Sequence, residues 1–349
     1  MEDIFEIEGR TVGWQQPAFI TAEIGLNHGG DPEMARQLIE AAADAGVDAV
    51  KFQVFRASSF ISGELAKAKH QKVSLESSES VFEMWQRLEL SSEELRGLCE
   101  QARKLGLVFH ASAFDRESVE FLSELGVGVF KIASGEVTNL PLIRATAAAG
   151  KPIIMSIGMA SLGEIEAALE AIGQAGNSRA VLMHCVANYP AKPQDVHLRR
   201  IEKLREVFGL PVGYSDHTTA PWACVASIAF GASFIEKHFT LNKDQPGTDH
   251  ALSADPAEMK AIVEGIREVE AALGSNALKP LETEKEGRTL FRRGLVATKA
   301  IAEGETITAE MIAAKRPATG IEPQHFDLVI GRQARRAIAS GAPLTWDSI

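Results

Sequence analysis

Hydrophobic and polar positions alternate in blocks along the first 240 residues of the chain. Short runs rich in valine, isoleucine and phenylalanine recur there, and a stretch with apolar residues at helical spacing follows each run. The runs that we expect to form strands are 19–25, 49–55, 107–114, 129–134, 152–157, 180–186, 211–217 and 234–240. Most of the helical stretches end in glycine, which commonly follows the last residue of a helix. The pattern predicts eight strands that alternate with helices, the last helix at 255–274.

Eight strands alternating with eight helices are typical of a (β/α)8 TIM barrel in the α/β class. An open doubly wound sheet is the alternative, and such a sheet usually carries a GxGxxG turn after its first strand. Here residues 25–31, GLNHGGD, follow the first strand and do not fit that motif. We therefore predict a barrel. The longest interval between two strands, 56–90, is predicted to be a loop with room for small elements of its own.

The pattern changes in the C-terminal part of the chain. A charged stretch at 276–289 predicts a linker, and helical spacing gives way to short apolar runs and glycine turns over 290–349. Two segments there, 299–312 and 336–349, share six identical positions at a separation of 37 residues. Chance similarity in alanine-rich sequence is the alternative, but two copies of a strand–turn–strand unit favour a small β-rich domain. The expected organisation is a barrel domain at 1–275, the linker and this second domain.

Composition narrows the class of protein. The 349 residues are 45% hydrophobic and 24% charged, which is ordinary for a soluble globular protein with a sizeable core. The formal net charge is −11 and no basic stripe is visible, so we expect no nucleic-acid partner. No apolar stretch approaches the roughly 20 residues of a membrane span, and no signal peptide is evident. Cys99, Cys185 and Cys224 lie far apart without metal-ligand spacing, which favours free thiols in a reducing compartment and a cytoplasmic protein.

Polar residues gather where the predicted strands end. In a barrel of this kind the chemistry lies at the carboxyl ends of the strands, and the opposite ends here are apolar. The polar residues at or just beyond the carboxyl ends are Glu23, Asn27, His28, Lys51, Gln53, His110, Ser112, Lys131, Ser134, Glu136, Ser156, His184, Asn188, Tyr189, Ser215, Asp216, His217, Glu236 and His238. Any one of them could be a solvated strand end or a satisfied core residue, and His28, His110 and His184 fit that description best. So many in one place indicate an active site, because charged groups are rarely buried without partners.

Side-chain alternation groups some of these residues on one face. Lys51 shares a face with Gln53, because residues two apart in a strand point the same way. Glu236 shares a face with His238 for the same reason. His217 and His238 end adjacent strands of the predicted barrel. Two imidazoles with water or a substrate oxygen suit Mn²⁺, Zn²⁺, Co²⁺ or Fe²⁺ in an open site.

A second group of strand-end residues suits an anion. The members of this candidate cradle for phosphate or carboxylate are Lys51, Ser112, Lys131, Ser134 and Ser156. Either lysine could instead form a Schiff base, as in a metal-free aldolase. The histidine pair argues against that alternative, because a metal ion and an iminium would be alternative electrophiles. Phosphate, metal and carboxylates together indicate carbon–carbon bond chemistry on a small phosphorylated substrate.

Eight motifs carry a resemblance to a known family. In chain order they read AEIGLNHGG, VKFQVF, FKIASGE, SIGMAS, HCVANYP, GYSDHT, EKHFT and PGTDHALS. Together they resemble the sialic acid synthase (N-acetylneuraminate synthase) family over essentially the whole chain. The C-terminal part is similar to the antifreeze-like (SAF) domain, a β-clip fold, that ends these enzymes. The resemblance implies condensation of phosphoenolpyruvate with an N-acylated hexosamine, such as N-acetylmannosamine, to give a nonulosonic acid and phosphate.

The resemblance also implies roles for individual residues. The metal ligands would be His217 and His238, with Mn²⁺ ahead of Co²⁺, Mg²⁺, Fe²⁺ and Zn²⁺. The phosphoenolpyruvate contacts would be Lys51, Ser112, Lys131, Ser134, Ser156 and Ser215. The sugar contacts would be Gln53, Glu136, Tyr189, Asp249 and Arg316. The residues with catalytic roles would be Glu23, Lys51, Lys131 and Glu136.

Two further points follow from the resemblance. In the family, the arginine at the position of Arg316 reaches the active site of the partner subunit, so a domain-swapped homodimer is implied. One motif departs from the family, whose members often read CTxxYP where this chain has CVANYP. A phosphoenolpyruvate-side asparagine of the family would align with Ala187, so either this contact is lost or Asn188 replaces it.

Two other classes of protein compete with this interpretation. A metallohydrolase on a barrel commonly begins with a His-x-His pair on its first strand, and this chain has Glu23 and Ile24 there. A non-catalytic sugar-binding relative would lack a metal ligand or a phosphate lysine, and none is missing. Within the family the acceptor stays open between N-acetylmannosamine, its 6-phosphate and the diacetamido hexoses that lead to legionaminic or pseudaminic acid. We expect the loop at 56–90 to contact the parts of the sugar that differ between these acceptors. Surface-polysaccharide synthesis is the expected pathway in each case.

Overall fold

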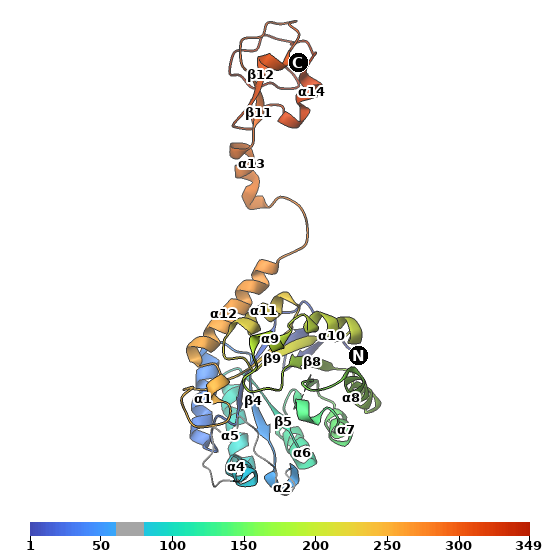
Figure 1. The fold of residues 1–349 in the computed structure, drawn as a ribbon, viewed down its shortest axis with the longest axis vertical. Coiled ribbons are helices and arrows are strands. Elements are labelled where there is room, and N and C mark those ends of the chain that lie inside the picture. The colour runs from blue at the N-terminus through green and yellow to red at the C-terminus, as the bar shows by residue number, and fades with distance from the viewer. Residues whose placement is uncertain (61–79) are drawn as a thin grey trace. The chain divides into compact units, whose positions relative to one another are not determined.

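A closed barrel of eight parallel strands forms the larger part of the molecule in a computed structural model that describes residues 1–60 and 80–349 (Figure 1). The strands are β3 (Phe19–Gly25), β4 (Ala49–Val54), β5 (Val108–Ala113), β6 (Phe130–Ile132), β7 (Ile153–Ser156), β8 (Ala180–Cys185), β9 (Val212–Asp216) and β10 (Phe234–His238). Consecutive strands are neighbours, and β10 closes the barrel by pairing with β3. The predicted TIM barrel is confirmed, because each predicted apolar run contains one of these strands.

Helices surround the strands (Figure 1). The main ones are α1 (Pro32–Asp44), α5 (Ser92–Lys104), α6 (Arg116–Leu125), α7 (Leu140–Ala148), α8 (Leu162–Gln174), α10 (Arg200–Phe208), α11 (Trp222–Ala229) and α12 (Pro256–Leu273). Several begin with a capping box, in which a serine or aspartate and a glutamate three residues later satisfy each other's free backbone N–H groups; α5, α8 and α12 are examples. In the described parts of the chain, no helix has the length and apolar character needed to cross a membrane.

In the part of the predicted loop 56–90 that the structure describes, two segments form short helices, α2 (Ala57–Phe60) and α4 (Val81–Arg87). The rest of that loop, 61–79, lies outside the described residues. A further short helix, α9 (Pro193–Val196), follows β8. These pieces lie after β4 and β8, at the end of the barrel where the strand-end residues gather.

Apolar side chains fill the amino end of the barrel. An N-terminal hairpin of β1 (Ile4–Ile7) and β2 (Arg10–Gly13), which the sequence analysis did not predict, contributes Phe5 and Ile7 to this cluster. The barrel residues of the cluster include Phe19, Ala49, Val108, Val129, Ile154, Val181, Met183 and Phe234. Because apolar side chains fill this end, the inward-facing polar side chains lie towards the carboxyl ends of the strands.

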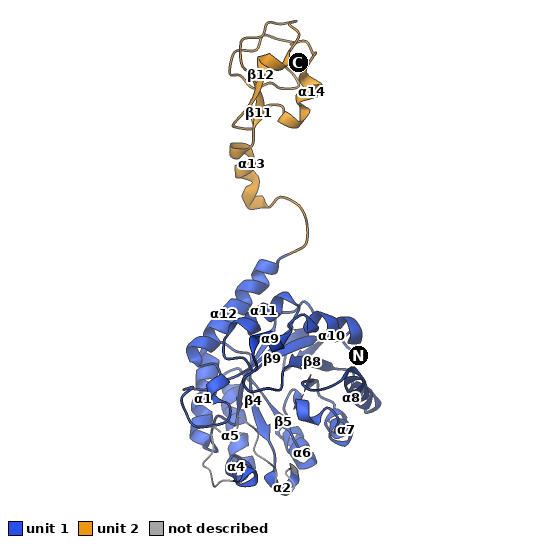
Figure 2. Ribbon diagram, in the orientation of Figure 1, with its two compact units in different colours: residues 1–274 blue, residues 275–349 orange. Residues whose placement is uncertain are grey.

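Residues 275–349 form a second compact unit, and residues 1–274 form the first (Figure 2). The second unit has its own apolar core, which includes Leu295, Ile307 and Leu344. It contains β11 (Gly294–Ala297), β12 (Ile312–Lys315), α13 (Lys285–Phe291) and α14 (Phe326–Val329). α13 begins within the stretch 276–289 that the sequence predicted as a linker and ends two residues beyond it. Ile301 and Ile338, which occupy equivalent positions 37 residues apart in the two repeats, form a bridge with each other. The repeat therefore corresponds to paired halves of one small unit.

Candidate active site

A polar cavity of about 550 Å³ lies at the carboxyl end of the barrel. The predicted site residues that line it are Glu23, Lys51, Gln53, Ser112, Lys131, Ser134, Ser156, Tyr189, Ser215, His217, His238 and Asp249. Its lining also includes Glu236 and the apolar side chains of Leu26, Trp85, Phe114 and Met159. Residues from all eight barrel strands or the loops that follow them thus meet in one space.

Two buried lysines share one glutamate at the bottom of this cavity. Lys51 Nζ lies 3.1 Å from Glu236 Oε1 and 3.3 Å from Glu23 Oε1. Lys131 Nζ lies 3.7 Å from Glu236 Oε2. Ser215 donates a further hydrogen bond of 3.0 Å to Glu236 Oε1. The four charged groups form one network, and Glu236 is its centre.

The sequence analysis placed Glu236 on the His238 face but gave it no role. Strand alternation does predict its inward direction. The strand pattern does not show that the Glu236 carboxylate reaches both lysines, because β10 is not a neighbour of β4 or β6 in the sheet. The contact crosses the barrel interior, and such distances depend on the closed fold.

The charge states of the network follow from burial and from neighbouring charges. Burial raises the pKa of Glu23 to about 7, although Lys51 acts in the opposite direction. Burial also tends to raise the pKa of Glu236, but Lys131 and Lys51 outweigh it and hold this carboxyl below its usual range. Burial lowers the pKa of Lys131 to about 8. Burial also tends to lower the pKa of Lys51, but the negative charges of Glu23 and Glu236 outweigh this effect and raise it. Near neutral pH, Glu23 is therefore the group of this network that exchanges protons most readily.

Hydroxyl and peptide N–H groups surround the lysines. Lys131 Nζ donates to Ser156 Oγ at 2.6 Å. The backbone N–H of Gly158 donates to Ser134 Oγ at 3.0 Å, and Ser134 Oγ lies 3.1 Å from Cys185 Sγ. A Cβ atom at Gly158 would come within 2.9 Å of that sulfur, so the close approach of the loop requires glycine. The anion cradle predicted from the sequence is thus brought together around Lys131.

Two neutral imidazoles also lie in the lining. The ring centroids of His217 and His238 are 5.4 Å apart. His217 Nδ1 lies 2.7 Å from the carbonyl oxygen of Val186, which fixes the proton on Nδ1 and leaves the lone pair on Nε2. His238 Nδ1 is buried and has no hydrogen-bond partner in the described part of the chain; Asp249 Oδ2 lies 3.6 Å away. Burial lowers the pKa of His217 to about 4 and holds the pKa of His238 well below its usual value.

These two rings fit the divalent metal ion that the sequence predicted. Neutral imidazole is the ligand form, and the carbonyl of Val186 orients His217 in the way that outer-shell partners of metal ligands commonly do. Within residues 1–60 and 80–349, no group of three or more histidine, cysteine, aspartate or glutamate side chains could hold a metal ion. An ion at His217 and His238 would therefore take its remaining ligands from water or substrate oxygens.

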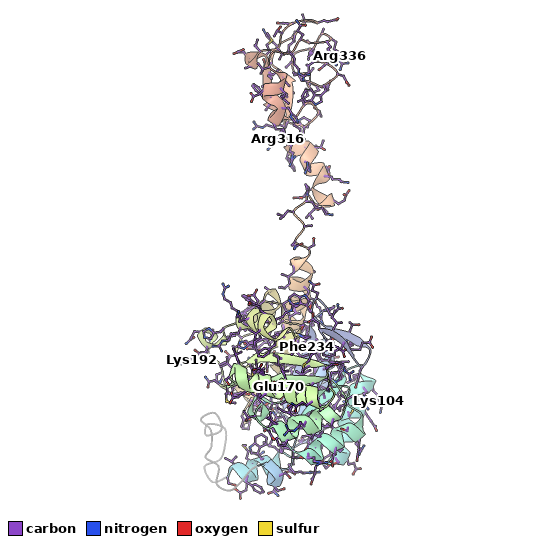
Figure 3. The ribbon with its side chains drawn as sticks, turned by 90° about the vertical axis from the view of Figure 1, so that its right-hand side faces the viewer. Lys104, Glu170, Lys192, Phe234, Arg316 and Arg336 are labelled. Carbon is purple, nitrogen blue, oxygen red and sulfur yellow. The ribbon has the colours of Figure 1, made fainter. Side chains whose placement is uncertain are left out.

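The predicted sugar contacts divide into three groups. Gln53 and Tyr189 lie in the lining; the Tyr189 ring is 4.3 Å from the His217 ring. Asp249 also lines the cavity, and burial raises its pKa to about 6. Glu136 lies outside the lining, in the turn after β6, where Asn139 donates to its carboxylate at 2.7 Å. Arg316 belongs to the second unit, is exposed, and stands 6.0 Å over the Phe291 ring (Figure 3).

The structure also places the two residues of the motif that departs from the family pattern. Ala187 and Asn188 both line the cavity, and Asn188 is the more exposed of the two. Either position can therefore face a ligand.

Trp85, on α4, lines the cavity as well and lies in the predicted loop at 56–90. An aromatic residue inside a long loop gave no signal in the sequence analysis.

The three other histidines at predicted strand ends have structural environments. His28 Nδ1 accepts a hydrogen bond from the backbone N–H of Gly30. His184 Nε2 lies 2.6 Å from the carbonyl oxygen of Val196, and its ring packs beside Tyr214. His110 lies inside the barrel with Nε2 3.4 Å from Thr21 Oγ1. None of the three lines the described cavity.

Comparison with known proteins identifies the same reaction class. The model of the NeuB family matches residues 38–277, and that of the SAF domain matches residues 292–349. The chain is 40% identical over 341 residues to an N,N'-diacetyllegionaminic acid synthase of Legionella pneumophila, covering 97% of this chain and 96% of that one. It is 35% identical over 335 residues to the N-acetylneuraminate-9-phosphate synthase of Homo sapiens, covering 93% and 90%. The crystal structure of N-acetylneuraminic acid (sialic acid) synthetase from Leptospira borgpetersenii is 32% identical, with a TM-score of 0.72, and covers 81% of this chain and 94% of that one.

Proposed function

The chain belongs to the NeuB family, and from this premise we propose that it condenses phosphoenolpyruvate with an N-acylated hexosamine to give a nonulosonic acid and phosphate. The observation that carries the proposal is the composition of the cavity. Two buried ammonium groups around Glu236 lie in the same space as two neutral imidazoles, His217 and His238. Cationic groups suit a phosphorylated carboxylate, and the imidazoles suit a metal ion that receives a carbonyl oxygen.

Phosphoenolpyruvate would bind at the lysines. Lys51 and Lys131 would neutralise its carboxylate and phosphate, and Ser134, Ser156 and the Gly158 loop would orient its oxygens. Glu236 partly neutralises both ammonium groups. It therefore keeps the two lysines close together before the anion arrives, although like charges repel each other.

His217 and His238 would hold a divalent cation, for which Mn²⁺ is the first choice. When bound, such an ion supplies a Lewis acid that polarises the aldehyde oxygen of the open-chain sugar. Tyr189 lies against the His217 ring, Asp249 lies 3.6 Å from His238, and Gln53 lines the same cavity, so these three would orient the sugar beside the ring pair. Their hydrogen-bonding groups match hydroxyl and acetamido groups.

The reaction balances with one water molecule. C3 of phosphoenolpyruvate forms a bond to the aldehyde carbon, and the aldehyde oxygen becomes a hydroxyl by taking up a proton. Water adds to C2 and releases a proton, and the C–O bond to phosphate then breaks so that the electron pair leaves with phosphate. Glu23 would accept the proton that the water releases. Its pKa is about 7, and its Oε2 is buried without a hydrogen-bond partner in the described residues.

For the acceptor we propose a 2,4-diacetamido hexose. The support is the 40% identity over nearly the whole length to a protein named N,N'-diacetyllegionaminic acid synthase, against 35% to a protein that makes N-acetylneuraminate 9-phosphate. The apolar side chains of Leu26, Trp85 and Phe114 in the lining would suit the methyl group of a second acetamido substituent.

The deciding experiment measures phosphate release from phosphoenolpyruvate with Mn²⁺. The acceptor panel is N-acetylmannosamine, its 6-phosphate and the diacetamido hexoses, each repeated with a chelator. We expect chelator-sensitive release that is fastest with a diacetamido hexose. Release with N-acetylmannosamine alone would overturn the acceptor and retain the reaction. No release with any sugar, from protein shown to be folded, would overturn the reaction itself.

A further inference from the structure

A buried ion pair lies directly behind the two imidazoles. Lys237 Nζ is 2.9 Å from Asp216 Oδ2, and the two side chains are 1% and 0% exposed. Asp216 ends β9 and Lys237 precedes the last residue of β10. Because neighbours in a strand point to opposite faces, both side chains point away from the cavity while His217 and His238 point into it. The pair therefore belongs to the layer between the strands and the helices.

The carboxylate of Asp216 holds the chain on both sides of His217. It accepts hydrogen bonds from Tyr214 Oη at 2.8 Å, Thr218 N at 2.9 Å and Thr218 Oγ1 at 3.1 Å. Cys224 Sγ, on α11, lies 3.4 Å from the same carboxylate. Lys237 Nζ donates a second hydrogen bond to the carbonyl oxygen of Thr218. The residue after His217 is thus bound by both members of the pair.

The position of the pair along the strands is informative. Asp216 and Lys237 form the last paired position between β9 and β10. His217 and His238 are the next residues on each strand, beyond the point where this ladder of backbone hydrogen bonds ends. Backbone pairing between these two strands therefore does not set the spacing of the two rings. The side-chain pair ties the strands together at that point instead.

Stability alone does not explain a charged pair in this layer. Taking two charges out of water carries a desolvation penalty, and apolar residues of similar volume are often as stabilising as a buried ion pair. A pair with fixed hydrogen-bond directions does restrict geometry. We propose that Asp216 and Lys237 are positioning residues that set the spacing of His217 and His238 for a divalent cation, an inference that rests on the proposed metal role of those two histidines.

The test replaces the charged side chains of Asp216 and Lys237 with neutral side chains of similar volume. In the double variant Asp216→Asn/Lys237→Met no buried charge is left unpaired, so the barrel is expected to fold. Calorimetric titration with Mn²⁺ alone should show a Kd about 10- to 100-fold weaker than for the unaltered protein, as is common when outer-shell partners of metal ligands are changed. Binding of phosphoenolpyruvate to metal-free protein should change less than twofold, about the scatter of such a titration, because Lys51 and Lys131 lie on other strands.

A matched control comes from the same place in the fold. Cys224→Ala loses packing against Asp216 but leaves the ion pair intact, so its Mn²⁺ affinity should match that of the unaltered protein. A folded double variant with unaltered Mn²⁺ affinity would overturn the positioning role and leave the proposed reaction standing. An unaltered protein that binds no Mn²⁺ would overturn the metal site and this inference together. If the double variant does not fold, Asp216→Asn/Lys237→Gln, which also removes both charges and keeps a hydrogen-bonding group at each position, is measured in the same way.

Discussion

At the residue scale, Glu236 balances the charge of the cavity. Its carboxylate accepts from Ser215 and lies within 3.7 Å of both lysine ammonium groups. Lys51 has Glu23 as a second partner, whereas Glu236 is the carboxylate that lies beside Lys131 in the described structure. The arrangement keeps positive charge concentrated where an anion is to bind and holds it stable when no anion is present.

Glu236→Gln should destabilise the folded protein. Removing one partner of a buried ion pair leaves the other charge unpaired, and this typically costs about 3 kcal/mol. Urea unfolding should show that loss, and inorganic phosphate in the millimolar range should recover part of it. Ser215→Ala, which removes one hydrogen bond to the same carboxylate, should cost about 1 kcal/mol. Equal stability of Glu236→Gln and the unaltered protein would contradict the central role of Glu236.

The affinity for phosphoenolpyruvate should depend on pH through Glu23. Its pKa of about 7 means that it is mainly neutral at pH 6 and mainly ionised at pH 8. The neutral form leaves more net positive charge beside the anion, so binding takes up a proton and the Kd rises with pH. Between pH 6 and pH 8 the extra loss of affinity should reach about tenfold. The pKa of Lys131, about 8, adds a further loss above pH 8.

Calorimetry on metal-free protein measures this dependence. The phosphate of the ligand also titrates near pH 6, so the comparison is made against Glu23→Gln, in which the ligand's own titration is unchanged. The variant should lose less affinity than the unaltered protein over the same pH range. Parallel pH profiles for the two proteins would show that Glu23 does not take up the proton.

The sequence predicted most of the site residues because their directions follow from strand alternation. Lys51, His217 and His238 lie in the lining as predicted. The role of Glu236 was missed because it depends on distances across the closed barrel, which no local pattern contains. Glu136 was predicted from its place just beyond β6 and from the family motif; its carboxylate accepts a hydrogen bond from Asn139 outside the described lining, and its sugar-binding role stays a prediction.

At the element scale, the connection from β7 to α8 brings backbone to the anion cradle. Gly158 follows β7, and its N–H donates to Ser134 Oγ. Gly158→Ala would place a methyl group 2.9 Å from Cys185 Sγ and 3.0 Å from Ser134 Oγ, closer than real Cβ contacts. The loop or Ser134 must then move. We expect phosphoenolpyruvate to bind about tenfold more weakly, a loss of about 1.4 kcal/mol.

A second glycine near the same connection provides the control. Gly163 lies in the first turn of α8, and a Cβ there would meet no atom within 4 Å. Gly163→Ala should leave the phosphoenolpyruvate Kd unchanged and raise the free energy of unfolding by up to about 1 kcal/mol. If both variants bind phosphoenolpyruvate as the unaltered protein does, the close approach of Gly158 has no part in anion binding.

The elements themselves were predictable to different degrees. The eight barrel strands agree with the predicted runs within one or two residues, because strands buried on both faces read as continuous apolar sequence. The N-terminal hairpin was missed because each of its strands is four residues long and buries only two of them: Phe5 and Ile7 in β1, Val12 and Gly13 in β2. α13 was missed because its charged sequence resembles a linker and none of its residues is buried.

At the scale of the whole molecule, the question is which copy of the chain supplies Arg316. The family resemblance implies a partner subunit, and Arg316 is an exposed residue of the second unit. The two units also differ in charge. Residues 275–349 carry 11 basic and 9 acidic side chains, a net charge of +2, so the −11 of the whole chain leaves −13 for residues 1–274. Opposite net charges are compatible with the arrangement that the family resemblance implies, in which the second unit of one copy serves the barrel of another, and we propose that arrangement here.

Mixing two inactive variants tests this proposal. Arg316→Ala lacks the arginine and keeps an intact barrel, whereas His217→Ala has a defective barrel and keeps the arginine. In a swapped dimer that contains one chain of each kind, the intact barrel receives the intact arginine, so one of its two sites is complete. If subunits pair at random after equal mixing, half of the dimers are mixed, and activity should return to about a quarter of that of the unaltered protein.

The outcome of mixing separates a shared site from a self-contained one. If each chain completes its own site, every chain in the mixture keeps its own defect and activity does not return at any mixing ratio. Sedimentation velocity on the same samples supplies the control, because restored activity should follow the dimer fraction as the protein is diluted. Activity that returns in a sample shown to be monomeric would contradict a site shared between subunits. Recovery near a quarter in dimeric samples would assign Arg316 to the partner's cavity and make the dimer the smallest active form.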